Sequence, residues 1–287
     1  MGHCPGADRG AVQRSGHASA GDGRHPPGGR PVGGLIVAPR PSELLRAAGA
    51  RSVSFVVPAY DEADNIDRMI ELTAAVGESL GDDWQIVVVD DASTDDTARR
   101  VRAHARDEPR IVLHRNERNL GCHPSELVGF SIASGDAIFF MPADLQIRPE
   151  AVIQCLPALA GADLVCTRRA RRADGVHRRW ISGCYNALVR RALGVSIRDV
   201  DSSILVRRTV VERILPEIDA KSAFVSAEIV ARTLAHGYRV AEADIDHYPR
   251  VGGRAKGINL HDLVHVPLDL LRSWRHLRGI RSGVSGG

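Results

Sequence analysis

The sequence has few cysteines, and they follow no recognisable pattern. The five cysteines stand at positions 4, 122, 155, 166 and 184, with neither a CxxC pair nor the spacing of a zinc site. Reduced thiols explain an odd, unpatterned set most simply, and reduced thiols are the rule in cytosolic proteins. The cysteines therefore give no support to a disulfide-stabilised secreted domain.

Long apolar runs are also missing. No segment approaches the roughly 20 apolar residues that a membrane-spanning helix needs. The first residues lack the apolar core of a secretory signal. We therefore expect the catalytic part of the chain to be cytoplasmic, with at most a peripheral attachment to the inner face of the membrane.

A strong excess of one charge is absent as well. The formal net charge is +3 over 287 residues, which does not argue for a nucleic-acid partner. Residues 1–40 are rich in Gly, Pro, Arg, Ser and His, and their apolar residues are too sparse for a core. This composition predicts a disordered leader.

Apolar runs alternate with helical patterns through the rest of the chain. Strand-like runs begin at Val53, Trp84, Ile111 and Ala137, and the first is apolar on both faces. Strands of that kind are typical of a parallel sheet that is covered on both sides. The β-α order predicts an α/β fold over residues 41–256, with a mostly parallel, Rossmann-like sheet flanked by helices.

The run AIFFMPADLQ at residues 137–146 begins as a buried strand and ends in a carboxylate and an amide. Pro142 cannot donate to a sheet ladder, so the strand should end there. On an extended chain Asp144 and Gln146 would point the same way, at the edge where open α/β sheets bind ligands. Such oxygen ligands suit Mg²⁺ or Mn²⁺, which would carry a ligand's phosphates. The alternative is a strand-end turn with a capping aspartate.

Five segments in a fixed order resemble family-2 glycosyltransferases of the GT-A fold, close to the dolichyl- and polyprenyl-phosphate mannose synthases. They are VSFVVPAYDEADNI, IVVVDDASTDDT, NLG with GFSIASGDAIFFMPADLQIRPE, DVDSS, and HYPRVGGRAKG. The similarity covers about residues 52–256. It implies an inverting transfer of a hexose, with mannose as first choice, from a GDP- or UDP-sugar to a lipid-phosphate acceptor at the membrane surface.

Two other functions stay open. One is transfer to a soluble acceptor, such as a secondary metabolite or a cell-wall precursor. The other is nucleotide-sugar binding without turnover. The resemblance also implies site residues. The nucleotide-binding positions are Pro58, Tyr60, Glu62, Asp90 and Asp91. The metal and diphosphate positions are Asp144 and Gln146.

Further candidates follow from the negative charge of the diphosphate leaving group and from the proton of an alcohol acceptor. Arg178, Arg179 and Arg250 are the arginines expected to neutralise the diphosphate leaving group. If the acceptor is an alcohol, a carboxylate must take its proton, and Asp201 and Glu228 are the candidates.

The chain departs from the family at Pro142, where the family usually carries an acidic residue. One carboxylate ligand is therefore missing from the expected metal site. Asp90 or Asp91 is the candidate to compensate for it.

The C-terminal segment, residues 257–287, has leucines at helical spacing with arginines between them. This pattern predicts an amphipathic basic helix. Such a helix either lies in a membrane interface or packs on the protein with a solvated outer face.

Overall fold

The computed structural model describes residues 38–171, 183, 185–191, 196–200, 202–250 and 265–273. All labelled elements belong to the compact unit Pro39–Gly287. The strands are β1 (Val53–Ala59), β2 (Trp84–Asp90), β3 (Ile111–Arg115), β4 (Ala137–Phe140), β5 (Leu164–Arg171), β6 (Ile204–Arg207) and β7 (Val240–Asp246). The helices are α1 (Pro41–Ala47), α2 (Ile66–Leu80), α3 (Thr97–Asp107), α4 (Cys122–Ile132), α5 (Ala151–Leu159), α7 (Arg208–Ile214) and α8 (Val225–Ala235).

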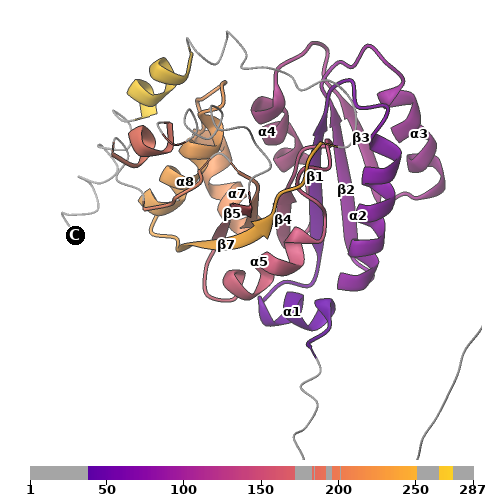
Figure 1. The fold of residues 1–287 in the computed structure, drawn as a ribbon, viewed down its shortest axis with the longest axis horizontal. Coiled ribbons are helices and arrows are strands. Elements are labelled where there is room, and N and C mark those ends of the chain that lie inside the picture. Colours follow the sequence, from indigo (N-terminus) through magenta and orange to yellow (C-terminus); the bar gives the residue numbers. More distant parts are fainter. Residues whose placement is uncertain are drawn as a thin grey trace, which may run out of the picture. The chain divides into compact units, whose positions relative to one another are not determined.

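One seven-stranded sheet organises this unit, in the order β3-β2-β1-β4-β6-β5-β7 (Figure 1). β1 lies between β2 and β4 and pairs with both in parallel. Among the described strands, β6 alone runs antiparallel to its neighbours, β4 and β5. The predicted mostly parallel sheet with flanking helices is confirmed.

The two faces of the sheet carry separate apolar cores. Phe55 of β1 and Phe139 of β4 point to one face, where their rings meet edge to face with centroids 6.4 Å apart. Val56 and Phe140, their neighbours in sequence, point to the other face. Successive side chains of a strand alternate between faces, so strands that are covered on both sides must be apolar throughout. This explains the uninterrupted apolar runs in the sequence.

Helices cover both faces. α1, α2 and α5 contribute to the core around Phe55, and α4, α7 and α8 contribute to the core around Val56 (Figure 1). α2 ends at Gly81, whose φ of 144° is a conformation that residues with a side chain rarely adopt. In the sequence, Gly81 directly follows an amphipathic pattern that runs to about Leu80 and therefore predicts a C-terminal helix stop, which the structure confirms.

Two local features that the sequence favours are wrong: a strand end at Pro58, where proline would stop the ladder, and a basic loop over the arginine-rich residues 168–179. Pro58 does not end its strand, because β1 continues to Ala59 and the carbonyl of Pro58 accepts a bond from the amide of Ala143. Arg168 and Arg169 do not belong to a basic loop, because both lie in β5. Arg168 pairs with Asp244 of β7, and Arg169 makes two bonds of 2.9 Å to the buried Asp199.

Cys155 and Cys166 are buried free thiols. Burial raises the pKa of the Cys155 thiol to about 12 and raises that of Cys166 as well. These two thiols are therefore packing residues without nucleophilic character.

Residues 265–273 form a helix against the core that contains α8. Its polar Asp269 is buried and accepts bonds from the Ser222 hydroxyl (2.7 Å) and the Lys221 amide (3.2 Å). Leu268 and Leu271 are instead exposed, at 44% and 57%. No helix in the described ranges is long and apolar enough to cross a membrane.

Candidate functional site

The chain leaves β1, β2 and β4 at one edge of the sheet, which we call the carboxyl rim. Ala59 of β1 pairs with Asp90 of β2, and the amide of Ala143, just beyond β4, donates to the carbonyl of Pro58. The three segments that follow these strands therefore lie side by side. Because parallel strands all present their carboxyl ends at the same edge, this arrangement follows from the topology.

The backbone is strained at this rim. Among the described residues, three residues other than glycine have positive φ: Asp61 (48°), Ala92 (61°) and Leu145 (61°). Each lies in the turn after one of the three strands. Left-handed conformations are unfavourable for residues with a Cβ and persist where the surrounding structure holds them, often at functional sites.

Replacing Ala92 by glycine should raise the free energy of unfolding by about 0.5 kcal/mol, because relief of the left-handed strain exceeds the added entropy of the unfolded chain. The matched control is Ala103→Gly in the exposed part of α3, which should lower it by about 1 kcal/mol. Urea denaturation measures both. A lower midpoint for Ala92→Gly would contradict the expectation.

Hydrogen bonds fasten the turn after β1 to the turn after β2. The Asp61 carboxylate accepts from the Thr94 amide (2.7 Å), and the Ser93 hydroxyl accepts from the Asp61 amide (2.9 Å). The Thr97 hydroxyl accepts from the Glu62 amide (2.9 Å). These contacts fix the position of Glu62, which is 6% exposed. The sequence showed an acidic, hydroxyl-rich pair of loops, but not that they bond to each other.

Asp91 anchors the loop between β3 and α4. One of its oxygens accepts from the side-chain amide of Asn116 and the backbone amide of Leu120, and the other accepts from the amide of Gly121, all at 2.8 Å. Asp91 is only 2% exposed. Its carboxylate is therefore committed to the fold, so we do not retain it as a nucleotide ligand or as a compensating metal ligand.

Asp90 differs from Asp91 although both are buried. Its Oδ1 accepts from the Ser93 amide at 3.2 Å. Its Oδ2 has no hydrogen-bond partner among the described atoms and lies 3.4 Å from Nε of Arg115, the residue beside it in β3. A buried carboxylate oxygen without a hydrogen bond is costly unless a ligand supplies the donor. Asp90 therefore remains a candidate ligand residue.

Three predicted site residues from distant parts of the sequence meet at the rim. Arg250, which follows β7, donates from Nη2 to the Glu62 carboxylate and from Nη1 to the Asp144 carboxylate, the latter at 3.3 Å. The side chains of Glu62, Asp144 and Arg250 are 7%, 14% and 17% exposed. An ion pair this sheltered is far less screened by water than a surface pair. We call these three residues the rim cluster.

The segment around Asp144 is a turn rather than an extended chain. Leu145 is left-handed, and the amide of Gln146 donates to Oδ1 of Asp144 at 3.1 Å. The expectation that Asp144 and Gln146 point the same way on an extended chain is therefore wrong. The alternative, a turn after the strand, is the conformation that the structure shows. The carbonyl of Gln146 accepts from the amide of Tyr248 (2.9 Å), which ties this turn to the segment that carries Arg250.

The described residues do not fit a Mg²⁺ or Mn²⁺ ion that is bound before any substrate. Among them, no group of three or more His, Cys, Asp or Glu side chains is placed to hold a metal ion. Asp144 offers a single carboxylate, and the guanidinium of Arg250 already faces its Oδ2. Pro142 supplies no ligand. Asp144 with Gln146 would at most join the phosphates of a substrate in binding a cation.

Glu228 lies elsewhere and has a structural role. It is fully buried in α8, where its carboxylate accepts from Nε of Arg232 (2.8 Å) and from the amide of Ala220 (2.9 Å). A general base must reach the proton that it removes. Glu228 is therefore not a suitable base, and the expectation of a catalytic role is not retained.

Of the four remaining predicted residues, the structure describes only Tyr60. Tyr60 directly follows β1 and is partly buried at the rim. Arg178, Arg179 and Asp201 lie outside the described residues.

His123 of α4 was not among the sequence candidates. Its Nδ1 lies 3.2 Å from the Ser226 hydroxyl of α8 and 3.3 Å from the buried Glu126, and its ring lies 6.4 Å from that of Phe140, the last residue of β4. No spacing in the sequence indicates that these residues meet. The contacts link α4 to α8 across the end of β4.

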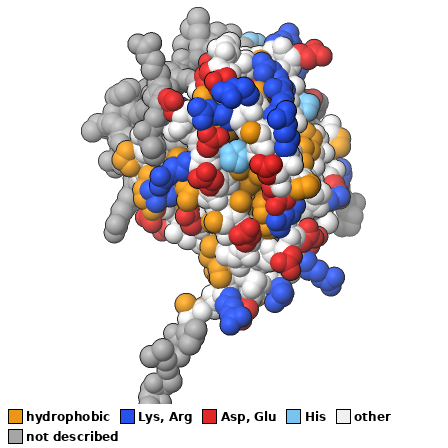
Figure 2. All heavy atoms as spheres, turned by 90° about the vertical axis from the view of Figure 1, so that its right-hand side faces the viewer, with side chains coloured by type: hydrophobic (Ala, Val, Ile, Leu, Met, Phe, Trp, Pro, Cys, Tyr) orange, Lys and Arg blue, Asp and Glu red, His pale blue; other side chains and the backbone are white. Residues whose placement is uncertain are grey.

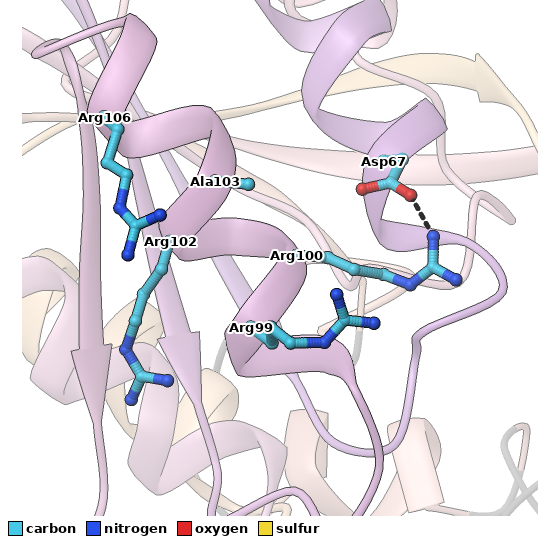
Figure 3. Close-up of a pocket in the computed structure, with 6 residues that line it drawn as sticks. All are labelled: Asp67, Arg99, Arg100, Arg102, Ala103 and Arg106. Atoms are coloured by element: carbon cyan, nitrogen blue, oxygen red, sulfur yellow. Dashed lines mark hydrogen bonds and ion pairs between the residues drawn. The ribbon is translucent and has the colours of Figure 1, made fainter.

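A hollow of about 580 Å³ lies on α3 and is lined by Asp67, Ala103 and four arginines, Arg99, Arg100, Arg102 and Arg106 (Figure 3). Arg100 pairs with Asp67, and Arg99 pairs with Asp96 (2.7 Å). On this face basic and acidic side chains lie next to one another (Figure 2). The hollow includes no residue of the rim cluster, and we assign it no ligand.

Comparisons with known proteins agree with this fold. A family model described as glycosyl transferase family 2 matches residues 54–215. Undecaprenyl-phosphate 4-deoxy-4-formamido-L-arabinose transferase from Pectobacterium carotovorum is 32% identical over 223 residues, 77% of this chain and 67% of that protein. The transferase of the same name from Yersinia enterocolitica is 34% identical over 224 residues, with the same shares.

Solved structures match over most of the chain. Glucosyl-3-phosphoglycerate synthase from Mycobacterium tuberculosis, in complex with Mn²⁺, UDP and phosphoglyceric acid, has a TM-score of 0.63 at 19% identity, covering 84% of each chain. The same enzyme with Mg²⁺ and UDP has a TM-score of 0.60 at 18% identity, covering 85% of each chain. Likeness at this level of identity shows the fold alone.

Proposed function

The chain belongs to glycosyl transferase family 2, and we propose that it transfers a hexose from a nucleotide-diphosphate sugar to a polyprenyl phosphate. The observation that carries the proposal is the meeting of Glu62, Asp144 and Arg250 at the carboxyl rim, next to the turn that follows Asp90. Ligands of open α/β sheets bind at this edge.

The rim offers complementary groups for the two halves of a nucleotide-diphosphate donor. Uracil and guanine each carry a ring N–H, and the Oδ2 atom of Asp90 is a buried acceptor that lacks a hydrogen bond. The diphosphate needs positive charge as it leaves, which Arg250 provides at the rim. These features support a nucleotide-diphosphate sugar as the donor, and they suit GDP and UDP equally. Mannose is the first sugar to test.

The acceptor is proposed from chemistry and from the named relatives. A phosphate oxygen is already anionic at neutral pH, so a lipid phosphate needs no general base. This agrees with the structural role of Glu228. The relatives from Pectobacterium and Yersinia are named as transferases to undecaprenyl phosphate.

Exposed leucines support a site of action at the membrane surface. Leu188 is 53% exposed, and Leu268 and Leu271 of the helix at residues 265–273 are exposed as well. In that helix the polar Asp269 is buried. Apolar side chains of this kind bury themselves in a lipid interface with a favourable transfer free energy. We propose that the protein is peripheral at the inner face of the membrane.

The divalent cation expected from the sequence stays a prediction. Solved structures of the same fold contain Mn²⁺ or Mg²⁺. If a cation enters this site with a donor, Asp144 and Gln146 are the oxygen-bearing side chains that would bind it.

A transfer assay tests the proposal. Labelled GDP- and UDP-sugars are incubated with the protein, and each is offered a short polyprenyl phosphate, the matching polyprenol and a soluble alcohol. We expect label in the polyprenyl phosphate and none in the polyprenol. Label in the soluble alcohol alone would identify a glycosyltransferase of another acceptor class, and donor binding without any product would identify a binding protein.

A further inference from the structure

The charge of the rim cluster differs from that of a site built for a divalent cation. Glu62 and Asp144 contribute two negative formal charges and Arg250 one positive charge, so the formal charges of these three side chains sum to −1. A third carboxylate would lower this to about −2, which a divalent cation neutralises. The place from which it would come, two residues before Asp144, is occupied by Pro142.

Both carboxylate oxygens of Asp144 already accept hydrogen bonds from the protein. Nη1 of Arg250 lies 3.3 Å from Oδ2 of Asp144, while Oδ1 accepts from the amide of Gln146. A cation at Oδ2 would have to displace the guanidinium or share the oxygen with it. Two positive charges so close together repel each other strongly in a sheltered site.

Glu62 holds Arg250 in this place through the other terminal nitrogen of the guanidinium. Its Oε1 accepts from Nη2 of Arg250, and its Oε2 accepts from the side-chain amide of Asn65 at 2.8 Å. The Glu62 backbone is itself fixed by the Thr97 hydroxyl. A planar guanidinium between two fixed carboxylates has little freedom left, which lowers the entropy cost of binding a phosphate.

We propose that in this chain the guanidinium of Arg250, positioned by Glu62 and Asp144, supplies the positive charge at the donor diphosphate, and that transfer needs no divalent cation. The catalytic part of this inference, that Arg250 serves the diphosphate and that transfer needs no divalent cation, rests on the proposed function. Its other part, that the site binds no metal ion tightly, concerns the protein alone. Arg250 is the residue that touches the diphosphate, and Glu62 is a positioning residue.

Metal binding is tested on the full chain without any donor. Mn²⁺ is titrated into the wild-type protein, into Pro142→Asp and into Pro142→Asn, with free Mn²⁺ followed by electron paramagnetic resonance and the melting temperature recorded in parallel. We expect no saturable binding to the wild type or to Pro142→Asn, and saturable binding with a rising melting temperature for Pro142→Asp. The asparagine variant controls for the loss of proline, since it matches aspartate in shape but lacks its charge. Saturable binding of Mn²⁺ to the wild type would overturn the inference, whether or not the variants fold.

The catalytic half is tested once a donor and an acceptor give transfer. We expect the wild-type rate in excess EDTA to stay within about twofold of the rate with Mn²⁺. Arg250→Ala should lose about 100-fold or more in kcat, the size of effect seen when one donor that stabilises a developing anion is removed. Added Mn²⁺ should not restore it, whereas Arg250→Lys should recover part of the rate. Loss of transfer in EDTA, or full activity of Arg250→Ala, would refute the proposal.

The two failures are distinguishable. If no nucleotide sugar is transferred, the proposed function fails, while the Mn²⁺ titration still decides whether Pro142 and Arg250 exclude a bound cation.

Discussion

Replacing Glu228 by alanine is expected to lower the free energy of unfolding by about 3 kcal/mol, since removing one partner of a buried ion pair leaves the other charge buried without compensation. Arg232 is 3% exposed and donates to Glu228 from Nε, at 2.8 Å. The amide of Ala220 would lose its acceptor as well. Glu217, 3.3 Å from Arg232, compensates only in part because it also pairs with His236.

The chain contains a matched control for this change. Glu212 and Arg208 of α7 form an ion pair of the same i,i+4 spacing, but their side chains are 60% and 42% exposed. Because exposed pairs contribute little, Glu212→Ala should cost about 0.5 kcal/mol or less. Thermal unfolding followed by circular dichroism measures both variants, and 3 kcal/mol corresponds to a drop of about 6–12 °C. Equal effects of the two substitutions would show that Glu228 does not stabilise the fold as we describe.

Gly129→Ala is expected to destabilise the protein by about 3 kcal/mol, the upper end of the usual cost of overpacking a core. Gly129 lies in α4, where a Cβ would meet Cγ1 of Val56 at 2.2 Å and Cγ2 of Val89 at 3.3 Å. Both valines are fully buried in the central strands β1 and β2. The χ1 angle of a β-branched side chain is stiff, so Val56 cannot turn away without moving the backbone.

Gly161→Ala is the control for this substitution. An added Cβ there would find only the carbonyl of Ala158, at 4.0 Å. We expect a change in the free energy of unfolding of about 0.5 kcal/mol or less, as for most surface substitutions. If Gly129→Ala melts at the temperature of the wild type, α4 does not pack on the sheet as closely as the structure shows.

Much of the fold follows from local patterns that the sequence displays. The strand at Val53 and the strand at Ala137 are apolar throughout because both faces of a parallel sheet are covered. Gly81 ends its helix because glycine adopts the positive φ that the stop requires. Such features depend on neighbours in sequence, which is why they were predictable.

The prediction at Pro58 failed for a physical reason that also applies elsewhere. Proline removes one donor from a strand, but β1 still pairs through the Pro58 carbonyl, which accepts from Ala143 on the neighbouring segment. Likewise, Asp90 and Asp91 are consecutive carboxylates at the end of β2, and residue type alone does not tell their roles apart. Only the approach of the loop at residues 116–121, distant in sequence, commits Asp91 to the fold and leaves Asp90 for a ligand.

The residue types along the chain are enough to predict the order of strands and helices, the edge of the sheet at which polar groups gather, and the missing carboxylate at Pro142. The folded chain was needed to show that Arg250 contacts both Glu62 and Asp144, which are 188 and 106 positions away from it. It also shows that Glu228 is a buried partner of Arg232. The reason is that the charge of a residue can be read from its type, whereas its partner depends on which distant segments the folded chain brings together.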